Sequence, residues 1–249
     1  MNNNSTRTGG RSIILTRPQE AAEKTAQRFR DAGAASDQIV IAPLLRIVII
    51  ASPLEPAAGE TVIFTSENGV RAVAPPRREV IAWCVGPNTA VAARDQGFHV
   101  EIAGGNADSL IAELERKRPS GKLVWFRGSH VAVDIAARLR GLGMKVRSET
   151  VYQQDSLHLT CEATDRLRSV PCILPVYSPR TAEVLTREAR ELPDHGHIIC
   201  CLGDRVRKAC GLDWHKRQAR DADSLFNLTR GAMATPCESS VSVNRAGNG

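Results

Sequence analysis

Short apolar runs alternate with stretches of helical periodicity along this chain, and no other feature of the sequence constrains its fold as strongly. Residues 13–15 form one apolar run, and residues 19–32 after it carry apolar side chains on one helical face before Gly33. The other runs expected as strands are residues 61–64, 83–85, 124–126 and 173–177. Alternating strands and helices predict an α/β fold with parallel sheets covered by helices. With 249 residues, the chain can form two such domains of about 100 to 125 residues each.

Serine and proline residues suggest where several of these elements begin and end. Ser66 and Ser178 each follow an apolar run and are expected to cap the next helix. Pro175 is expected to place the last strand at a sheet edge or at an irregularity, because proline cannot donate a ladder hydrogen bond. A further helix is expected over residues 130–142, with Asp134 solvated on its surface rather than catalytic.

Four local patterns occur twice in the same order, which indicates a duplicated unit. Arg17 and Arg127 each follow a predicted strand and precede a helix that ends at a glycine, with the same spacing. The other three pairs are Phe64-Thr65-Ser66 with Val176-Tyr177-Ser178, Cys84-Val85-Gly86 with Cys201-Leu202-Gly203, and Ala107-Asp108-Ser109-Leu110 with Ala222-Asp223-Ser224-Leu225. The repeat predicts two similar units at about residues 12–117 and 122–230.

Polar and basic residues gather where the predicted strands end. In parallel α/β sheets, ligands bind beyond these carboxyl ends, where helix N-termini also offer unpaired N–H groups. The candidate binding residues there are Arg17, Thr65, Ser66, Gly86, Thr89, Arg127 and Ser178. Hydroxyl, amide and guanidinium groups in such positions bind carboxylates or phosphates, and the net charge of +6 favours an acidic partner. For each serine, the alternative is a plain helix cap.

Tyr152 is a further candidate, because it lies in the extended stretch of residues 149–154 after the first repeat. A phenol can donate a proton or a hydrogen bond to a leaving oxygen. The alternative is a half-buried tyrosine of a β-sheet without a chemical role.

Several classes of protein are disfavoured by what the sequence lacks. It has no dinucleotide-binding glycine pattern, no GKS or GKT phosphate loop and no G-x-S-x-G motif. The seven cysteines form no C-x-x-C pair, so we expect reduced thiols in the cytoplasm and no metal site. The aromatic content of 4% and the scattered basic residues argue against nucleic-acid binding. No segment has the pattern of a signal peptide or a membrane span, and residues 1–11 and 233–249 are expected to be disordered tails.

Six short motifs resemble those of the uroporphyrinogen-III synthase family and follow the same order. They are Ile14-Leu15-Thr16-Arg17-Pro18, Phe64-Thr65-Ser66-Glu67-Asn68-Gly69-Val70, Val85-Gly86-Pro87-Asn88-Thr89-Ala90, Gly105-Asn106-Ala107, Thr150-Val151-Tyr152-Gln153 and Tyr177-Ser178-Pro179-Arg180-Thr181-Ala182. The resemblance covers about residues 12–230. It implies a discontinuous first lobe, residues 12–37 and 156–232, and a second lobe, residues 51–145. Two antiparallel linker strands, at 38–50 and 146–155, are implied to join these parallel-sheet α/β lobes.

The resemblance also implies a reaction, carried out by a monomer that holds its acidic substrate between the two lobes. Such synthases close the linear tetrapyrrole hydroxymethylbilane, which carries eight carboxylates, into uroporphyrinogen III. The last pyrrole ring is inverted, water is lost, and a spiro intermediate is the usual proposal; neither a metal nor an organic cofactor is needed. The resemblance implies substrate contacts for Thr65, Ser66, Thr89 beside Gly86, and Ser178. It implies that Tyr152 assists the departing hydroxyl.

One position departs from the family pattern. After Gly203 the family usually has a serine or threonine, whereas this chain has Asp204-Arg205. A carboxylate there repels the carboxylates of the substrate unless Arg205 neutralises it. An alternative therefore stays open, in which the chain is a non-catalytic module that keeps the synthase fold and only binds a tetrapyrrole or another polycarboxylate.

Overall fold

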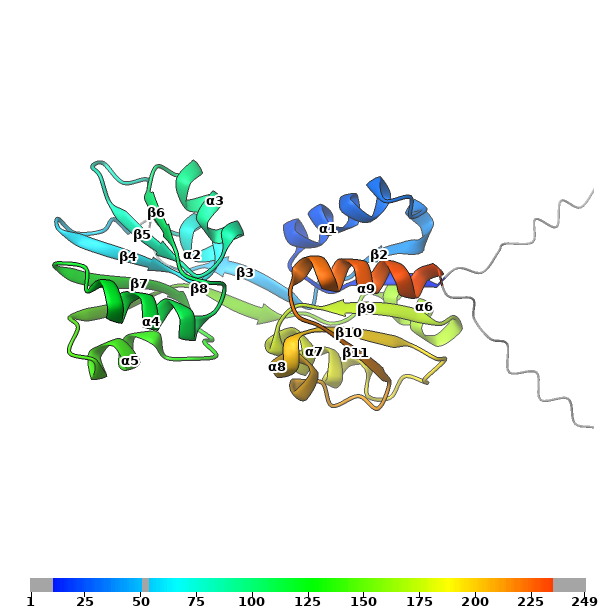
Figure 1. Cartoon of the computed structure of the whole chain (residues 1–249). Coiled ribbons are helices and arrows are strands. Elements are labelled where there is room, and N and C mark those ends of the chain that lie inside the picture. The colour runs from blue at the N-terminus through cyan, green and yellow to red at the C-terminus, as the bar shows by residue number, and fades with distance from the viewer. Residues whose placement is uncertain (1–10, 51–53, 235–249) are drawn as a thin grey trace, which may run out of the picture. The chain divides into compact units, whose positions relative to one another are not determined.

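The chain divides into two compact units, each with its own sheet (Figure 1). Unit 1 contains the residues up to 46 together with those from 156 onward, and unit 2 contains residues 47–155. The structure is a computed structural model that describes residues 11–50 and 54–234. The predicted tails lie outside the described residues except at their inner ends, where residues 233 and 234 complete a helix. Within the described part of the chain, no helix is long and apolar enough to cross a membrane.

Unit 1 is built on a five-stranded sheet with the order β11-β10-β9-β1-β2, and all of its strand pairs are parallel. The strands are β1 (Ser12–Leu15), β2 (Ile39–Ile41), β9 (Cys172–Val176), β10 (Ile198–Leu202) and β11 (His215–Ala219). The helices are α1 (Gln19–Asp31), the 3-10 turn η1 (Ser36–Gln38), α6 (Cys161–Ser169), α7 (Pro179–Ala189), α8 (Gly203–Ala209) and α9 (Ala222–Ala234). Because β1 lies between β2 and β9, the sheet joins both chain segments of the unit.

Helices cover both faces of this sheet, as the side-chain alternation along β1 requires. Ile13 and Leu15 pack with Phe29 of α1 and Phe226 of α9. Ile14 points to the other face and packs in a cluster with residues of α6, α7 and α8. Figure 1 accordingly shows α1 and α9 over one face and α7 and α8 over the other.

Unit 2 has a six-stranded sheet with the order β3-β8-β7-β4-β5-β6. The strands are β3 (Leu45–Ile49), β4 (Glu60–Phe64), β5 (Ile81–Cys84), β6 (His99–Ile102), β7 (Lys122–Gly128) and β8 (Val146–Ser156). The helices are α2 (Glu67–Arg71), α3 (Pro87–Asp95), α4 (Ala107–Lys117) and α5 (Ile135–Gly141). Phe64 and Phe126 pack under α2 and α3, whereas Ile63 and Trp125 pack under α4 and α5. The prediction of an α/β fold with parallel sheets covered by helices is therefore confirmed.

Residues 38–50, expected as one linker strand, contain two strands that belong to different sheets. Residues 39–41 form β2 beside β1 in unit 1, and β3 begins at Leu45 and pairs at the edge of the unit 2 sheet. Pro43 lies between them and interrupts the hydrogen bonding, because it has no N–H.

Two local predictions need comment. The strand that contains Pro175 is not at an edge, since β9 lies between β10 and β1, but its pairing with β1 stops before Pro175, which agrees with the predicted irregularity. Proline is tolerated there because the pairing with β1 ends at Ile173, while the pairing with β10 continues. The helix expected over 130–142 begins only at Ile135, because the Asp134 carboxylate accepts a first-turn backbone N–H at 2.9 Å and caps it.

Candidate active site

The strand order of unit 2 brings most of the predicted site residues to one edge of its sheet. Phe64 of β4 pairs with Phe126 of β7 and with Cys84 of β5, so the residues that follow these three lie side by side. They are Thr65 and Ser66 after β4, Arg127 in β7 and Gly86 after β5, while Tyr152 on β8 pairs with Gly128 next to Arg127. The backbones of these residues therefore lie side by side at this edge. The Arg127 side chain lies by Trp125 on one face of the sheet, and Tyr152 packs with Phe126 on the other.

Ser66 serves as a helix cap and also lies near Tyr152. Its Oγ accepts a hydrogen bond from the backbone N of Asn68 at 3.2 Å, which begins α2. The same side chain lies near the phenol of Tyr152, close enough to lower its pKa. The neighbouring Thr65 Oγ1 accepts a hydrogen bond from Trp125 Nε1 at 3.4 Å. The role of Trp125 in holding Thr65 could not be read from the sequence, since it depends on the pairing of two strands.

The Tyr152 phenol lies in an apolar environment and is only 6% exposed. Burial raises the pKa of this phenol, and the smaller opposing effect is that of the nearby Ser66 side chain, which lowers it. The net pKa lies above the ordinary value of 10, so the group is protonated at neutral pH and can donate its proton. The residue is thus more deeply buried than the half-buried sheet tyrosine considered as the alternative.

The region around Gly86 offers backbone N–H groups and open space. Gly86 precedes α3, and a Cβ atom added there meets no heavy atom within 4 Å. Thr89, in the first turn of α3, is only 7% exposed. A ligand can therefore approach the start of α3 more readily than the Thr89 side chain, whose substrate contact stays a prediction.

Arg127 and Arg17 are the two basic residues that the repeat singled out, and they have similar surroundings in their separate units. Arg127 Nη1 donates to the carbonyl oxygen of Gly128 at 2.9 Å, and its guanidinium lies 5.8 Å from the Trp125 ring centre. Arg17 Nη1 donates to Thr25 Oγ1 at 3.1 Å. Among the described residues, neither arginine has a carboxylate partner. Both can accept a carboxylate from a ligand.

Tyr177 is a neighbour of Arg17 in unit 1, and the sequence motifs contained it but gave it no role. The Arg17 guanidinium lies 4.2 Å from the centre of its ring, because β1 and β9 are neighbours and both residues follow these strands. Burial raises the pKa of the Tyr177 phenol, and the nearby Arg17 charge lowers it by less. The sequence contained one indication of a role for Tyr177, because this residue occupies the same position in the repeat as Thr65.

Ser178 and Asp204 decide how well the unit 1 edge suits an anion. Ser178 Oγ accepts a hydrogen bond from the backbone N of Thr181 at 3.1 Å and lies 2.8 Å from its Oγ1, so it caps α7. Asp204 forms an ion pair with Lys208 at 2.6 Å, and this contact holds the pKa of its carboxyl below the ordinary value. The charge of Asp204 is therefore balanced within α8 by Lys208. The repulsion that motivated the non-catalytic alternative is reduced accordingly.

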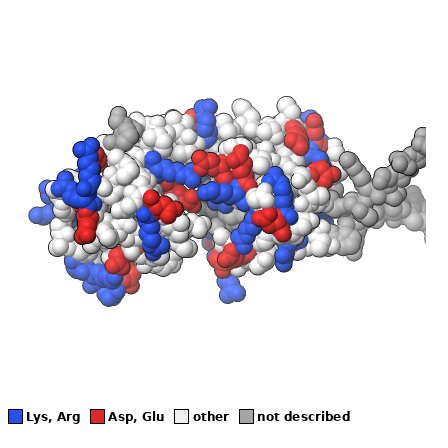
Figure 2. Space-filling model, turned by 90° about the horizontal axis from the view of Figure 1, so that it is seen from above, with Lys and Arg blue, Asp and Glu red and all other residues white. Residues whose placement is uncertain are grey.

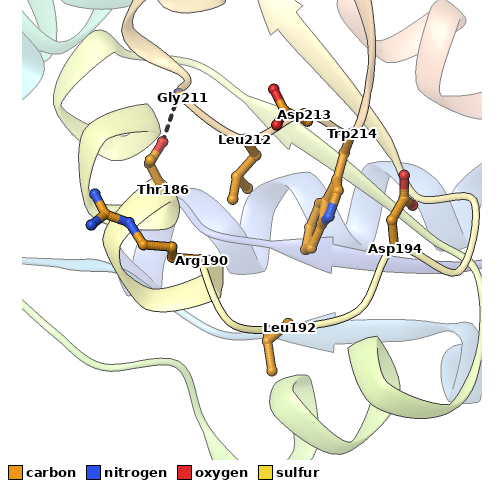
Figure 3. Close-up of a pocket in the computed structure, with 8 residues that line it drawn as sticks. All are labelled: Thr186, Arg190, Leu192, Asp194, Gly211, Leu212, Asp213 and Trp214. Carbon is orange, nitrogen blue, oxygen red and sulfur yellow. Dashed lines mark hydrogen bonds between the residues drawn. The ribbon is translucent and has the colours of Figure 1, made fainter.

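A cavity of about 370 Å³ lies in unit 1 where β10 and β11 begin, at the opposite end of these strands from the predicted site (Figure 3). Its lining residues are Thr186, Arg190, Leu192, Asp194, Gly211, Leu212, Asp213 and Trp214. None of the predicted site residues lines this cavity. Within the described residues, no group of three or more histidine, cysteine, aspartate or glutamate side chains could hold a metal ion.

The charges on the face drawn in Figure 2 are mixed, with lysine and arginine interspersed among aspartate and glutamate. Elsewhere in the described residues, basic and acidic side chains form exposed ion pairs, such as Arg28 with Asp223 and Arg116 with Glu113. The face in Figure 2 therefore has no continuous basic stripe of the kind that binds a nucleic-acid backbone.

Comparisons with known proteins agree with the fold. The family described as uroporphyrinogen-III synthase HemD matches residues 23–224. The crystal structure of a uroporphyrinogen-III synthetase from Helicobacter pylori superposes with a TM-score of 0.64, covering 89% of this chain and 99% of that one at 15% identity. A mutant uroporphyrinogen III synthase from Thermus thermophilus gives 0.54, with coverages of 88% and 96% and 13% identity.

A comparison with curated protein sequences gave no match. At identities this low, the two superpositions establish the fold, while the family match extends over most of the sequence. The chain therefore belongs to the uroporphyrinogen-III synthase family.

Proposed function

We propose that Tyr152 is the proton donor of the synthase reaction in this chain, and that the polar groups at the carboxyl edges of the two sheets anchor the carboxylates of the substrate. The reaction closes hydroxymethylbilane to uroporphyrinogen III with inversion of the last pyrrole ring and loss of water, a step of tetrapyrrole and haem biosynthesis. The observation that carries the assignment is the buried Tyr152 phenol near Ser66, at the carboxyl edge of the unit 2 sheet.

Loss of water from the hydroxymethyl group requires a proton at the leaving oxygen. The neutral phenol donates its proton to that oxygen as the C–O bond breaks, and water departs. The electron pair of the adjacent pyrrole nitrogen stabilises the carbocation that remains. To invert the last ring, the α-carbon of that ring that already carries a methylene bridge attacks the cation and forms a spiro intermediate. The bond from this carbon to its old bridge then breaks and leaves a second carbocation, stabilised by the neighbouring pyrrole. The unsubstituted α-carbon of the last ring bonds to this cation and loses a proton, which returns to the phenolate. The sequence of steps thus consumes no proton overall and needs neither a metal nor an organic cofactor.

The carboxylates of the substrate are proposed to bind Arg17, Arg127 and the N–H groups around Gly86. Guanidinium–carboxylate contacts are strong when the arginine is not already paired, which supports both arginines as anchors. Thr65, Ser66, Thr89 and Ser178 are proposed to add hydroxyl contacts. The positive net charge of the chain favours encounter with a substrate of this charge.

We further propose a cytoplasmic monomer that binds no nucleic acid. The cysteines among the described residues are all free, and most of them are buried, as suits a reducing compartment. The mixed charges in Figure 2 support the absence of a nucleic-acid surface.

Hydroxymethylbilane supplied to the purified protein without added metal or cofactor should be converted to the type III isomer. The linear substrate closes spontaneously to the type I isomer, so chromatographic separation of the two products measures enzymatic closure directly. Heat-denatured protein serves as the control and should give only type I. Tight binding of the linear substrate with only type I product would support the non-catalytic alternative instead.

Arg127→Gln should raise KM about tenfold or more with little change in kcat, because a charged hydrogen bond to a substrate carboxylate is worth roughly 1.5–3 kcal/mol. The matched control is Arg116→Gln in the same unit, which removes an exposed arginine paired with Glu113 and should leave KM unchanged. Steady-state kinetics on both variants make the comparison. An unchanged KM for Arg127→Gln would remove this residue from the substrate contacts.

A further inference from the structure

The pairing of β7 with β8 is irregular beside Tyr152. Arg127 pairs with Thr150, yet the next residue of β7, Gly128, pairs with Tyr152, so Val151 is an extra residue on β8. Such an insertion is a β-bulge, which changes the direction of the side chains that follow it.

The bulge places two consecutive side chains in the same core. In a regular strand, neighbours point to opposite faces, as Trp125 and Phe126 of β7 do by packing in different clusters. Val151 and Tyr152, by contrast, both pack in the cluster that contains Phe126. In an unbroken ladder Val151 would pair with Gly128, and the alternation would turn Tyr152 to the other face, away from α2. The bulge therefore directs the phenol toward Ser66 at the start of α2.

Gly128 provides the space in which the Tyr152 ring lies. A Cβ atom added to Gly128 would be 2.6 Å from Cε2 and Cζ of that ring and 2.9 Å from its hydroxyl oxygen. Such distances are well inside van der Waals contact, so the ring would have to move. The ring is 6% exposed and surrounded by packed side chains, and the backbone beside it is held by a hydrogen bond from Ser129 N to the Tyr152 carbonyl oxygen at 2.9 Å. A methyl group at Gly128 therefore displaces the phenol hydroxyl.

We propose that Gly128, together with the bulge at Val151, is a positioning residue for the catalytic phenol: it fixes the place of the Tyr152 hydroxyl beside Ser66 and contacts no reacting atom itself. This inference rests on the proposed role of Tyr152. A displacement of about 1 Å in a catalytic group can cost up to a hundredfold in rate.

Gly128→Ala should lower kcat about tenfold to a hundredfold with little change in KM. If Gly128 acts through the phenol, the substitution should have no further effect once the phenol is gone, so Gly128→Ala/Tyr152→Phe should have the kcat of Tyr152→Phe alone. Gly141→Ala is the matched control in unit 2, because a Cβ there meets no atom within 4 Å and the backbone is not in the left-handed region. This control should retain the wild-type kcat.

A spectroscopic readout separates positioning from a general loss of stability. The chain has only two tyrosines, so protein labelled with ¹³C at tyrosine Cζ gives two resonances, which Tyr177→Phe assigns. In Gly128→Ala the Tyr152 resonance should shift while the Tyr177 resonance stays in place. If Gly128→Ala does not fold, adding Tyr152→Leu, which removes the ring, should restore folding. In the wild type, the Gly128 Hα protons should show a nuclear Overhauser effect to the Tyr152 ring.

The outcomes distinguish this inference from the function on which it rests. Full turnover of Tyr152→Phe contradicts the proposed function. A large loss in Tyr152→Phe, combined with an equal loss from Gly128→Ala in both backgrounds, contradicts only the positioning role. An unmoved Tyr152 resonance in Gly128→Ala, a missing Overhauser effect, or a failure of Tyr152→Leu to restore folding overturns it as well.

Discussion

Tyr152→Phe should lower kcat by about a hundredfold or more while leaving the protein folded, because positioned proton donors contribute roughly 10² to 10⁴ to such reactions. The substitution removes only the hydroxyl. The ring stays in its apolar surroundings against Gly128, and Ser66 keeps its capping bond to Asn68. KM should change little, because substrate anchoring is assigned to other residues. The rate of type III isomer formation is the measurement.

Tyr177→Phe is the control for this prediction, since it removes the only other phenol of the chain. The ring remains beneath the Arg17 guanidinium, whose attraction depends on the aromatic face rather than on the hydroxyl. Its kcat should therefore stay close to that of the wild type. Unchanged turnover in Tyr152→Phe, or an equally large loss in Tyr177→Phe, would remove the special role of Tyr152.

Arg147→Leu should lower the free energy of unfolding by about 2 kcal/mol at neutral pH, the largest stability effect that we expect from a single ion pair. Arg147 Nε and Nη2 each donate to one carboxylate oxygen of Glu60 at 2.7 Å, and the Glu60 side chain is only 5% exposed. Breaking a fully buried pair costs roughly 3–5 kcal/mol. The smaller figure of about 2 kcal/mol follows because the Arg147 side chain is 40% exposed and solvent screens it.

The effect of Arg147→Leu should depend on pH. The Arg147 hydrogen bond is the main reason that the pKa of Glu60 lies below its ordinary value of 4.5. A carboxylate whose pKa is lowered by folding stabilises the fold above its unfolded pKa, and this contribution is lost as the pH falls through its folded pKa. The stability difference between wild type and variant should therefore be full at neutral pH and shrink below pH 4.5. Urea unfolding across this range measures it.

Two further variants test the physical reason for this loss. Glu60→Gln should cost less than Arg147→Leu, because the arginine that it leaves behind is partly exposed and still pairs with Glu149 at 2.7 Å. Arg116→Leu, which breaks an exposed pair with Glu113, should change stability little. Equal losses in all three variants would show that burial of Glu60 has no special effect.

The fold could be predicted from the sequence because its signals are local. Apolar runs, helix periodicity and the caps at Ser66 and Ser178 depend on residues a few positions apart, and the structure confirms both caps. For Pro175 the sequence could not decide between an edge strand and an irregularity, because whether a strand is central depends on which distant strands pair with it. Helix periodicity alone also predicted that α5 begins too early. Periodicity does not show that Asp134 caps the helix, so it cannot locate the first residue of α5.

The candidate site could be predicted in its residue types but not in its supporting contacts. Hydroxyl and guanidinium groups after strands are visible in a sequence, because strand ends are visible. The bulge at Val151 depends on the register between two strands, and that register is not encoded in the spacing of either strand alone. The same holds for the hydrogen bond from Trp125 to Thr65 and for the placement of Arg17 over Tyr177, which join segments far apart in the chain.

Unit 1 consists of two chain segments separated by unit 2, and this affects its folding during translation. Unit 2 is one continuous segment, so all of its strands are available to a nascent chain soon after residue 155 has been translated. β1 and β2 precede unit 2 in the chain, yet Ser12 pairs with Cys172, and the cover that α1 gives Ile13 is completed only when Phe226 of α9 has been translated. The apolar side chains of β1 therefore lack some of their packing partners during most of translation. Exposed apolar surface of this kind makes unfinished proteins aggregate or bind chaperones. A premature stop before β9 would release a unit 2 with all of its strands, attached to an apolar segment without its neighbours.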